Sequence, residues 1–202
     1  MTTQFGDLVV SVDKDLEGKG VILAETVGFE NPQVTLDGGS VKDVYHYTYD
    51  WFESRDKVLD KLDNTDGSHN GENYFAYTFY IKNNGTETFD YNASLEITGV
   101  AKSCDEAARI MVYKNGEPTI YAKPVLGTTD TAEFVSHEQS DKAVLFHDND
   151  TVYTETLEDF SPGDVDKYTV VIWFEGEDSE CINDIMGGHM RLAMNFEAAE
   201  LE

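Results

Sequence analysis

Apolar and polar residues alternate with a period of two along most of the chain, and the spacing typical of helices is nearly absent. Segments with this alternation are predicted to be strands: 8–12, 44–52, 74–82, 89–98, 109–113, 119–122, 144–146, 151–157, 168–174 and 190–196. Helix is expected only in connections, at 54–62, 103–108 and 178–186, with Ser54 as the N-cap of the first. Without βαβ alternation or an internal repeat, this pattern predicts an all-β fold, an antiparallel β-sandwich or jelly roll in a single domain over residues 1–202.

Turn residues indicate which strands pair. The Asn-Gly pairs at 84–85 and 115–116 each predict a hairpin between the strands on either side. The last two strands flank an acidic connection that ends at Gly187-Gly188. We expect these two strands to close the chain as antiparallel neighbours.

The segment 44–52, VYHYTYDWF, alternates strongly, and four aromatic side chains are expected on one strand face: Tyr45, Tyr47, Tyr49 and Trp51. Such a row is more often part of a hydrophobic core, and the polar residues between the aromatic ones favour that interpretation. Aromatic rows also serve as platforms on which sugar rings stack. The segment therefore leaves open a second function, that of a carbohydrate-binding β-sandwich module.

The feature of the composition that says most about possible partners is the net charge. The chain has 40 acidic and 14 basic side chains, a formal net charge of −26 with histidine neutral, while hydrophobic residues at 40% suffice for a sizeable core. A surface this acidic repels phosphate backbones and anionic lipid headgroups, which argues against nucleic-acid binding and against electrostatic docking to a membrane. It favours solubility, cations and basic partners.

No apolar run in the sequence is long enough to span a bilayer. The first residues, MTTQF, lack both the basic and the apolar region of a signal peptide. Two interpretations are open: a cytosolic protein, or a mature fragment behind a new methionine. The terminal Leu201-Glu202, typical of a cloning remnant, favours the second, so we expect an extracellular or cell-surface protein whose signal peptide has been removed.

The chain contains two cysteines, Cys104 and Cys181. An even number in an exported chain is compatible with a disulfide, which would contribute roughly 4 kcal/mol by closing a long loop. The alternative is two independent small hydrophobic residues. A zinc site is not supported, because no CxxC or closely spaced His/Cys cluster accompanies them.

Calcium is the cofactor that the acidic loops suggest. Asp13, Asp15 and Glu17, followed by Gly18, begin like an EF-hand loop, but the twelfth position is Ala24 and lacks the bidentate acid of that motif. Further acids that could contribute to composite sites are Asp63, Asp66, Asp148 and Asp150. The alternative is ordinary Asx turns in polar loops.

No motif for a reaction stands out. The sequence has no HExxH, no GxSxG and no GxxxxGK, and its histidines are scattered. With 40 carboxylates, acidic pairs at any spacing occur by chance, so the acid and base of a glycosidase cannot be inferred. We therefore predict that the chain is not an enzyme.

Three segments together resemble a known family. They are YTFYIKNNGTETFDYNASLEI at 77–97, LEDFSPGDVDKYTV at 157–170 and VVIWFEGEDSECINDIMGGHMRLAMNFEA at 170–198. Their order, with a strand and KN-G turn, a PGD turn and a final strand ending in NFE, is similar to that of TasA and camelysin-type surface proteins of Gram-positive bacteria. The similarity covers about half of the chain.

The resemblance implies an exported jelly roll of the cell envelope or of matrix fibres. Members of this family polymerise by donor-strand exchange, in which the N-terminal strand of one subunit completes the sheet of the next. The matching strand here would be 4–12, with Leu8, Val10 and Val12 on one face. The alternative, favoured for the isolated protein, is that this strand pairs within its own domain. The expected function is a non-enzymatic secreted or cell-surface structural protein of a Gram-positive bacterium, a matrix-fibre or pilus-like subunit that self-associates.

Overall fold

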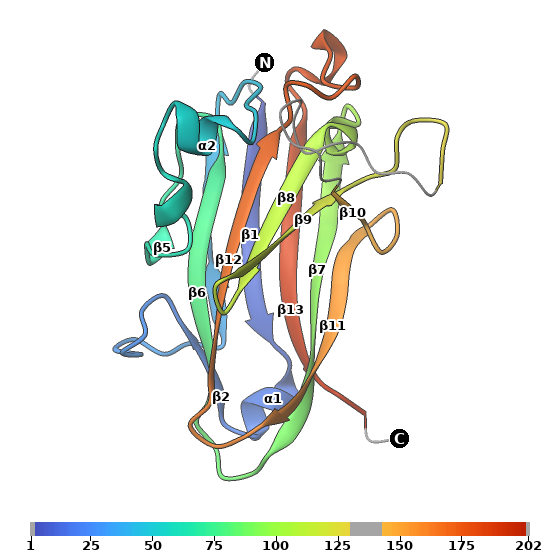
Figure 1. Ribbon diagram of the computed structural model, residues 1–202. Coiled ribbons are helices and arrows are strands. Elements are labelled where there is room, and N and C mark those ends of the chain that lie inside the picture. Colours follow the sequence, from blue (N-terminus) through green and yellow to red (C-terminus); the bar gives the residue numbers. More distant parts are fainter. Residues whose placement is uncertain (1–2, 130–142, 201–202) are drawn as a thin grey trace.

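Two β-sheets packed face to face form the protein (Figure 1). The computed structural model describes residues 3–129 and 143–200, so Leu201-Glu202, the expected cloning remnant, lies outside the described residues. The first sheet consists of β1 (Gln4–Val12), β3 (Thr35–Asp37), β4 (Ser40–Lys42), β7 (Phe89–Ala101), β11 (Thr151–Phe160) and β13 (His189–Ala198). Their spatial order is β11-β7-β13-β1-β3, and β4 also pairs with β1.

The second sheet consists of β2 (Val21–Ala24), β5 (Gly67–Ser68), β6 (Phe75–Asn83), β8 (Ala108–Lys114), β9 (Glu117–Ala122), β10 (Val144–Leu145) and β12 (Val165–Phe174). Its order is β10-β9-β8-β12-β6-β2, with β5 paired to β6. Both sheets are mixed, because β1 runs parallel to β13 and β10 runs parallel to β9. The prediction of an all-β sandwich is confirmed.

Helices are short and lie in connections: α1 (Lys14–Gly18), α2 (Trp51–Ser54) and the 3-10 turns η1 (Leu59–Lys61), η2 (Cys104–Glu106) and η3 (Asn183–Ile185). The turns expected at 103–108 and 178–186 correspond to η2 and η3. The helix expected at 54–62 is wrong. Ser54 ends α2 and is not an N-cap, and Lys57 adopts a left-handed φ of 54° before η1 begins, which interrupts a continuous helix.

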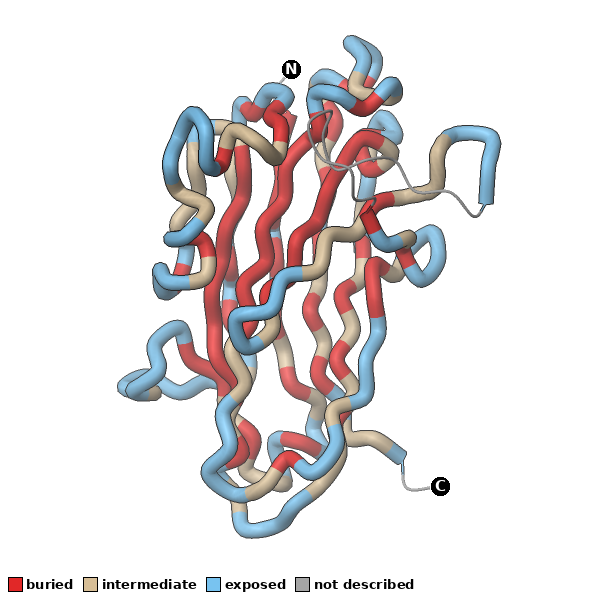
Figure 2. The backbone as a smooth tube through the Cα atoms, viewed as in Figure 1, coloured by how far each residue is buried: buried red, intermediate tan, exposed pale blue. Residues whose placement is uncertain are grey.

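The core lies between the sheets, and a second hydrophobic cluster covers the outer face of the second sheet (Figure 2). The long connection between β4 and β6 supplies much of that second cluster, including Tyr47, Phe52, Leu62 and Tyr74. Because β6 is covered on both faces, eight of its nine residues are buried. This explains why its sequence, FAYTFYIKN, carries large side chains on both faces.

Two pairings expected from the sequence are wrong, and one is confirmed. The strands β6 and β7 follow each other in the chain but lie in different sheets, so the Asn-Gly turn at 84–85 crosses between the sheets instead of closing a hairpin. The strands β12 and β13 are separated in the same way, and β13 instead pairs with β7 and β1. The hairpin of β8 and β9 around residues 115–116 is present.

In the described part of the chain, every helix is too short or too polar to cross a membrane.

Candidate functional site

The first strand, β1, occupies an interior position in its sheet although it begins the chain. It pairs in parallel with β13 from Gln4 opposite His189 to Val12 opposite Phe196. On its other side, the antiparallel ladders to β3 and β4 each extend over only three residues. An N-terminal segment therefore fills a slot between β13, the last strand of the fold, and the short strands β3 and β4 at residues 35–42.

The apolar side chains of β1 face the core. Phe5, Leu8 and Val10 are completely buried and Val12 is 9% exposed, whereas Val9 on the opposite face is 42% exposed. The prediction that Leu8, Val10 and Val12 share one face is confirmed.

A bulge at Gly6 and Asp7, which both have positive φ, brings Phe5 onto the same face as Leu8 despite their odd spacing. Gly6 also lies close to β4, because a Cβ atom there would come within 2.6 Å of the Gly39 carbonyl oxygen. Its φ of 115° and this close approach both require glycine.

The burial of β1 is energetically large for a domain of this size. Fully burying each of its four inward side chains stabilises the fold by roughly 1.5–3 kcal/mol, about 6–12 kcal/mol together and an upper estimate. Whole domains are stable by only about 5–15 kcal/mol. The slot that β1 fills must therefore be filled for the sandwich to remain folded.

Hydrogen bonds fix both ends of β1. Where the strand begins, the backbone N–H of Gly187 donates to the hydroxyl of Thr3 at 2.8 Å, and the N–H of Gln4 donates to the carbonyl of Gly188 at 3.1 Å. Where it ends, the N–H of Asp13 donates to the carbonyl of Phe196 at 2.9 Å. The acidic connection before β13 thus holds the start of β1.

The acids proposed as calcium ligands have local structural roles. The Asp13 carboxylate caps α1 by accepting from the N–H of Leu16 at 2.8 Å, so 13–18 forms a helical turn and not the start of an EF-hand loop. Asp15 and Glu17 lie within that turn. The Asp148 carboxylate accepts from the backbone N–H groups of Asp150 and Thr151, an Asx turn.

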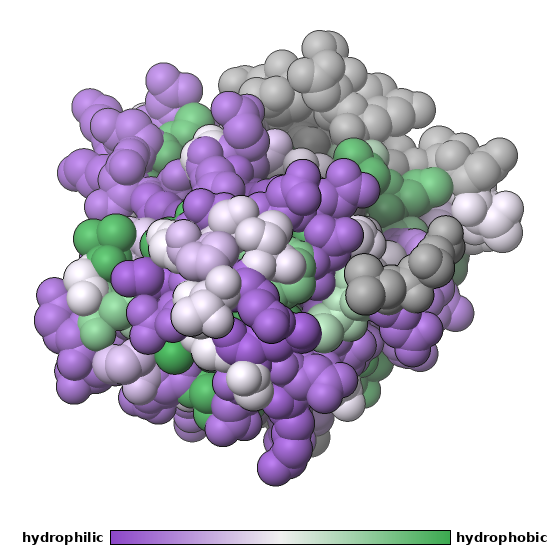
Figure 3. Space-filling view, turned by 90° about the horizontal axis from the view of Figure 1, so that it is seen from below, coloured by the Kyte–Doolittle hydropathy of each residue, from purple (hydrophilic) through white to green (hydrophobic). Residues whose placement is uncertain are grey.

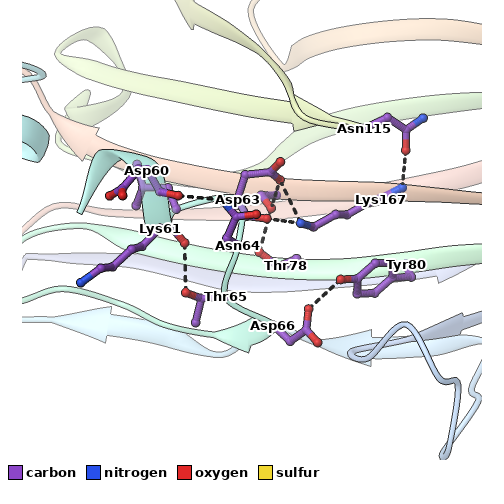
Figure 4. Close-up of polar contacts among 12 residues, drawn as sticks. Asp60, Lys61, Asp63, Asn64, Thr65, Asp66, Thr78, Tyr80, Asn115 and Lys167 are labelled. Carbon is purple, nitrogen blue, oxygen red and sulfur yellow. Dashed lines mark hydrogen bonds and ion pairs between the residues drawn. The ribbon is translucent and has the colours of Figure 1, made fainter. Parts of the chain in front are cut away.

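Asp63 and Asp66 attach the long connection to the outer face of the second sheet (Figure 4). Asp63 accepts from the hydroxyl of Thr169 at 2.9 Å and forms an ion pair with Lys167, whose ammonium also donates to the Asp63 carbonyl. Asp66 accepts from the hydroxyl of Tyr80 at 2.7 Å. Within residues 3–129 and 143–200, no three His, Cys, Asp or Glu side chains are grouped so that they could hold a metal ion, and calcium binding stays a prediction.

The aromatic row expected at 44–52 does not form. The segment is not a strand, because after a single bridge between Tyr47 and Glu175 the chain turns into α2. Tyr47 is buried among Phe52 and Tyr74, whereas Tyr45 is 62% exposed and the remaining two aromatic residues are half-buried. The four side chains therefore offer no single platform for a sugar ring.

Tyr47 is instead a fixed part of the second hydrophobic cluster. Its hydroxyl donates to Asp56 at 2.6 Å, and burial together with this carboxylate raises the pKa of Tyr47. The guanidinium of Arg55 lies 4.1 Å above the ring of Trp51. Tyr47 therefore belongs to a hydrophobic core, as the first of the two interpretations of the aromatic row predicted. The prediction that Tyr47 lies in a strand is wrong.

Glu175 was not identified as a candidate from the sequence. It joins the long connection between β4 and β6 to the end of β12. Its side chain is fully buried and accepts hydrogen bonds from the indole of Trp173 at 3.0 Å and from the backbone N–H groups of Tyr49 and Glu177, each at 3.2 Å. Burial raises the pKa of Glu175 despite these donors. The only sequence signal was an acid placed directly after the apolar run VVIWF.

A buried ion pair lies in the same region. Arg109 in β8 and Asp178 in the connection after β12 have fully buried side chains, and the Nη1 atom of Arg109 lies 2.8 Å from Oδ2 of Asp178. The second oxygen of Asp178 accepts from the N–H of Glu180 at 2.7 Å. The pair ties the acidic connection to the sheet, and a single arginine in an apolar strand gave no sign of its partner.

The two cysteines are free thiols in the structure, in agreement with the second of the two alternatives, two independent small residues. Cys104 is buried and Cys181 is half-buried, and both pack against the core between the sheets. Burial raises the pKa of Cys104 to about 12 and that of Cys181 to about 11, because a thiolate is poorly solvated there. Both thiols are consequently poor nucleophiles.

Comparisons with known proteins add little beyond this geometry. No known family profile matches the chain, and no curated protein is significantly similar to it in sequence. Two crystal structures of a β-glucosidase from Kluyveromyces marxianus, one in complex with glucose, are weakly similar. They have TM-scores of 0.29 and 0.26, are 15% and 16% identical, and match 90% and 86% of this chain. The matched part is only 16% and 17% of their own length. A likeness this weak carries no argument about function.

Proposed function

We propose that this chain is a non-enzymatic structural protein of the surface or matrix of a Gram-positive bacterium, and that it self-associates by exchanging β1 between copies. The observation that supports this most is the position of β1, an N-terminal strand in the interior of a sheet. The strand β1 precedes the other strands of the fold in sequence, and its neighbours β13, β3 and β4 are separate segments, so an exchange of β1 leaves the order of the other strands unchanged. The vacated slot then accepts an identical strand from a second copy.

The hydrogen bonding of β1 favours exchange over a permanent place. Its longest ladder, to β13, is parallel, and parallel pairing is slightly less stable per residue than antiparallel pairing. Its antiparallel ladders to β3 and β4 are three residues long. A donated strand reproduces all these bonds and the burial of the same side chains, so the exchanged and closed forms have similar contact energies.

Association through the outer edges of the sheets is less favourable. At one edge of the first sheet, β11 carries the exposed acids Glu155, Glu158 and Asp159, and such charges discourage pairing with another strand. Hydrophilic side chains also cover most of the end of the molecule seen in Figure 3. Strand exchange allows copies of this acidic chain to associate through a buried apolar contact.

A cysteine pair across β1 and β13 tests the proposal. Ser11 lies opposite Asn195 in the parallel register, and the Ser11 hydroxyl donates to the Asn195 side chain at 3.3 Å. Two singly substituted proteins, Ser11→Cys and Asn195→Cys, would be prepared with Cys104 and Cys181 replaced. They would be unfolded together, refolded together at high concentration, and oxidised.

Strand exchange predicts covalent heterodimers between these two proteins on a non-reducing gel. The matched control replaces Ser11→Cys with Thr156→Cys on the exposed edge strand β11, where only random collisions give cross-links. Equal yields in the two mixtures would contradict the proposal. A higher yield with Thr156→Cys would instead indicate association through the sheet edge.

A further inference from the structure

A buried lysine contacts two carboxylates at the open end of the β8–β9 hairpin. The Nζ atom of Lys123 lies 2.5 Å from Oδ2 of Asp105 in η2 and 3.6 Å from Oε1 of Glu106. The side chains of Lys123 and Asp105 are only 10% and 6% exposed. The neighbouring residues Cys104, Ala107, Ala108 and Ala122 are completely buried, so the pair lies in apolar surroundings.

The other lysine ion pairs of the described residues differ from this one. Lys19 with Glu87 and Lys114 with Glu155 are solvent-exposed pairs at 3.9 and 3.3 Å. Lys167 lies 3.7 Å from the Asp63 carboxylate, with the two side chains 22% and 15% exposed and no second carboxylate in the ion pair. Among the lysines of residues 3–129 and 143–200, Lys123 alone combines direct contact with a carboxylate, a side chain that is only 10% exposed, and a second carboxylate.

We propose that Lys123 and Asp105 form an intramolecular isopeptide bond, with Glu106 carrying the proton. The ammonium first gives one proton to the Asp105 carboxylate, which leaves a neutral amine and a neutral acid. The amine nitrogen attacks the Asp105 Cγ atom. Glu106 takes the second proton from nitrogen and delivers it to the departing hydroxyl group. The Nζ–Cγ bond forms, the Cγ–O bond breaks, and one water molecule leaves, so charge and atoms balance.

Two obstacles oppose this condensation, and the geometry removes the first and reduces the second. Bulk water opposes amide formation, but holding the two groups in contact gives effective molarities on the order of 10⁵ M or more. The ion pair opposes the first proton transfer: burial alone would lower the pKa of Lys123, and the hydrogen bonds and charges of Asp105 and Glu106 outweigh it and raise that pKa. Burial offsets part of this opposition, because the neutral amine and acid lose less solvation than the charged pair does, but the transfer remains uphill and the following loss of water must drive the reaction.

Mass spectrometry of the purified protein tests the bond directly. The intact wild-type protein is expected to be lighter than its sequence mass by one water molecule. Tryptic digestion should yield a branched peptide in which the isopeptide bond joins residues 103–109 to residues 115–142, because trypsin cleaves after Lys102, Arg109, Lys114 and Lys142 but not at Lys123, which precedes proline. The full sequence mass after prolonged incubation, together with separate linear peptides, would overturn the proposal and leave an ordinary buried ion pair.

Substitutions test the roles of Lys123, Asp105 and Glu106 in forming the bond. Lys123→Arg keeps the charge but is expected to abolish the mass loss, and Glu106→Gln is expected to slow it at least tenfold. Asp105→Asn should still react, now releasing ammonia, and so give a product of the same mass as the cross-linked wild type. Lys114→Arg, in the exposed pair with Glu155, serves as the control and should leave the mass loss unchanged. An unchanged mass loss in Lys123→Arg would also overturn the assignment.

Discussion

Removing the carboxylate of Asp178 is expected to destabilise the protein far more than removing an exposed acid. Asp178→Ala leaves the Arg109 guanidinium in a site where both side chains are fully buried. A buried charge without its ion-pair partner lowers the free energy of unfolding. An arginine cannot avoid this loss by giving up its proton, because its pKa lies above the accessible range. The connection that holds the start of β1 also loses its attachment to β8.

The magnitude follows from the burial of the pair. Breaking a buried ion pair by removing one partner lowers the free energy of unfolding by about 3–5 kcal/mol, which is a large part of the roughly 5–15 kcal/mol available to a domain. Replacing both partners by apolar residues is often nearly neutral. The double variant Arg109→Met/Asp178→Leu is therefore expected to recover most of the stability that Asp178→Ala loses.

Urea denaturation followed by tryptophan fluorescence measures these differences, with the slope m compared to confirm that the transitions remain two-state. The control is Glu155→Ala, whose ion pair with Lys114 is solvent-exposed at 3.3 Å and should contribute less than about 1 kcal/mol. A loss below about 1 kcal/mol for Asp178→Ala would refute the reasoning. A double variant no more stable than Asp178→Ala would show that the charge itself is needed.

Further predictions concern β1, Glu175, Tyr47 and the thiols. Val10→Glu places a charge in the core and should prevent stable folding, whereas Val9→Glu, on the exposed face of the same strand, should change the midpoint of urea unfolding little; equal effects would contradict the assigned facing. Because burial raises the pKa of Glu175, its contribution to stability is fully present below its ordinary pKa of 4.5 and declines as pH rises through the raised value. Glu175→Gln should therefore gain stability relative to wild type as pH rises above 4.5 in matched urea titrations, and a constant difference would count against the assignment. Tyr47→Phe loses the hydrogen bond to Asp56 and should lower the free energy of unfolding by about 1 kcal/mol, while Tyr45→Phe on the surface should not. Thiol titration with Ellman's reagent should detect two thiols after unfolding without reductant and a slow reaction in the native protein; detecting none would favour the disulfide alternative instead.

The sequence predicted strands well where burial on one face imposes alternation, as in β1 and β13. It failed in the connection between β4 and β6, which covers the outer face of the second sheet. The alternation at 44–52 mimicked a strand, but Tyr47 is held by a bridge to Glu175 and by the cluster around Phe52, contacts that are far apart in sequence. Tertiary packing overrode the local pattern.

Pairing was less predictable than the strands themselves. The Asn-Gly turn at 115–116 closes a hairpin, but the similar turn at 84–85 crosses between the sheets. Both turns have the same local sequence, Asn-Gly. They differ because β8 and β9 lie in one sheet, whereas β6 and β7 lie in different sheets. Buried ion pairs such as Arg109 with Asp178 were equally hidden, because 40 acids surround few bases and no spacing rule selects a partner.

The parallel ladder between β1 and β13 has a consequence for the time at which the fold is completed. The partner of the first strand is the last strand, so a chain made from its N-terminus exposes the apolar face of β1 until residues 189–198 are available. At a synthesis rate of about 5–20 residues per second, this interval lasts roughly 10–35 s. Under the proposed exchange, this interval is the time in which β1 of one chain can enter the slot of a neighbouring chain before its own β13 is available.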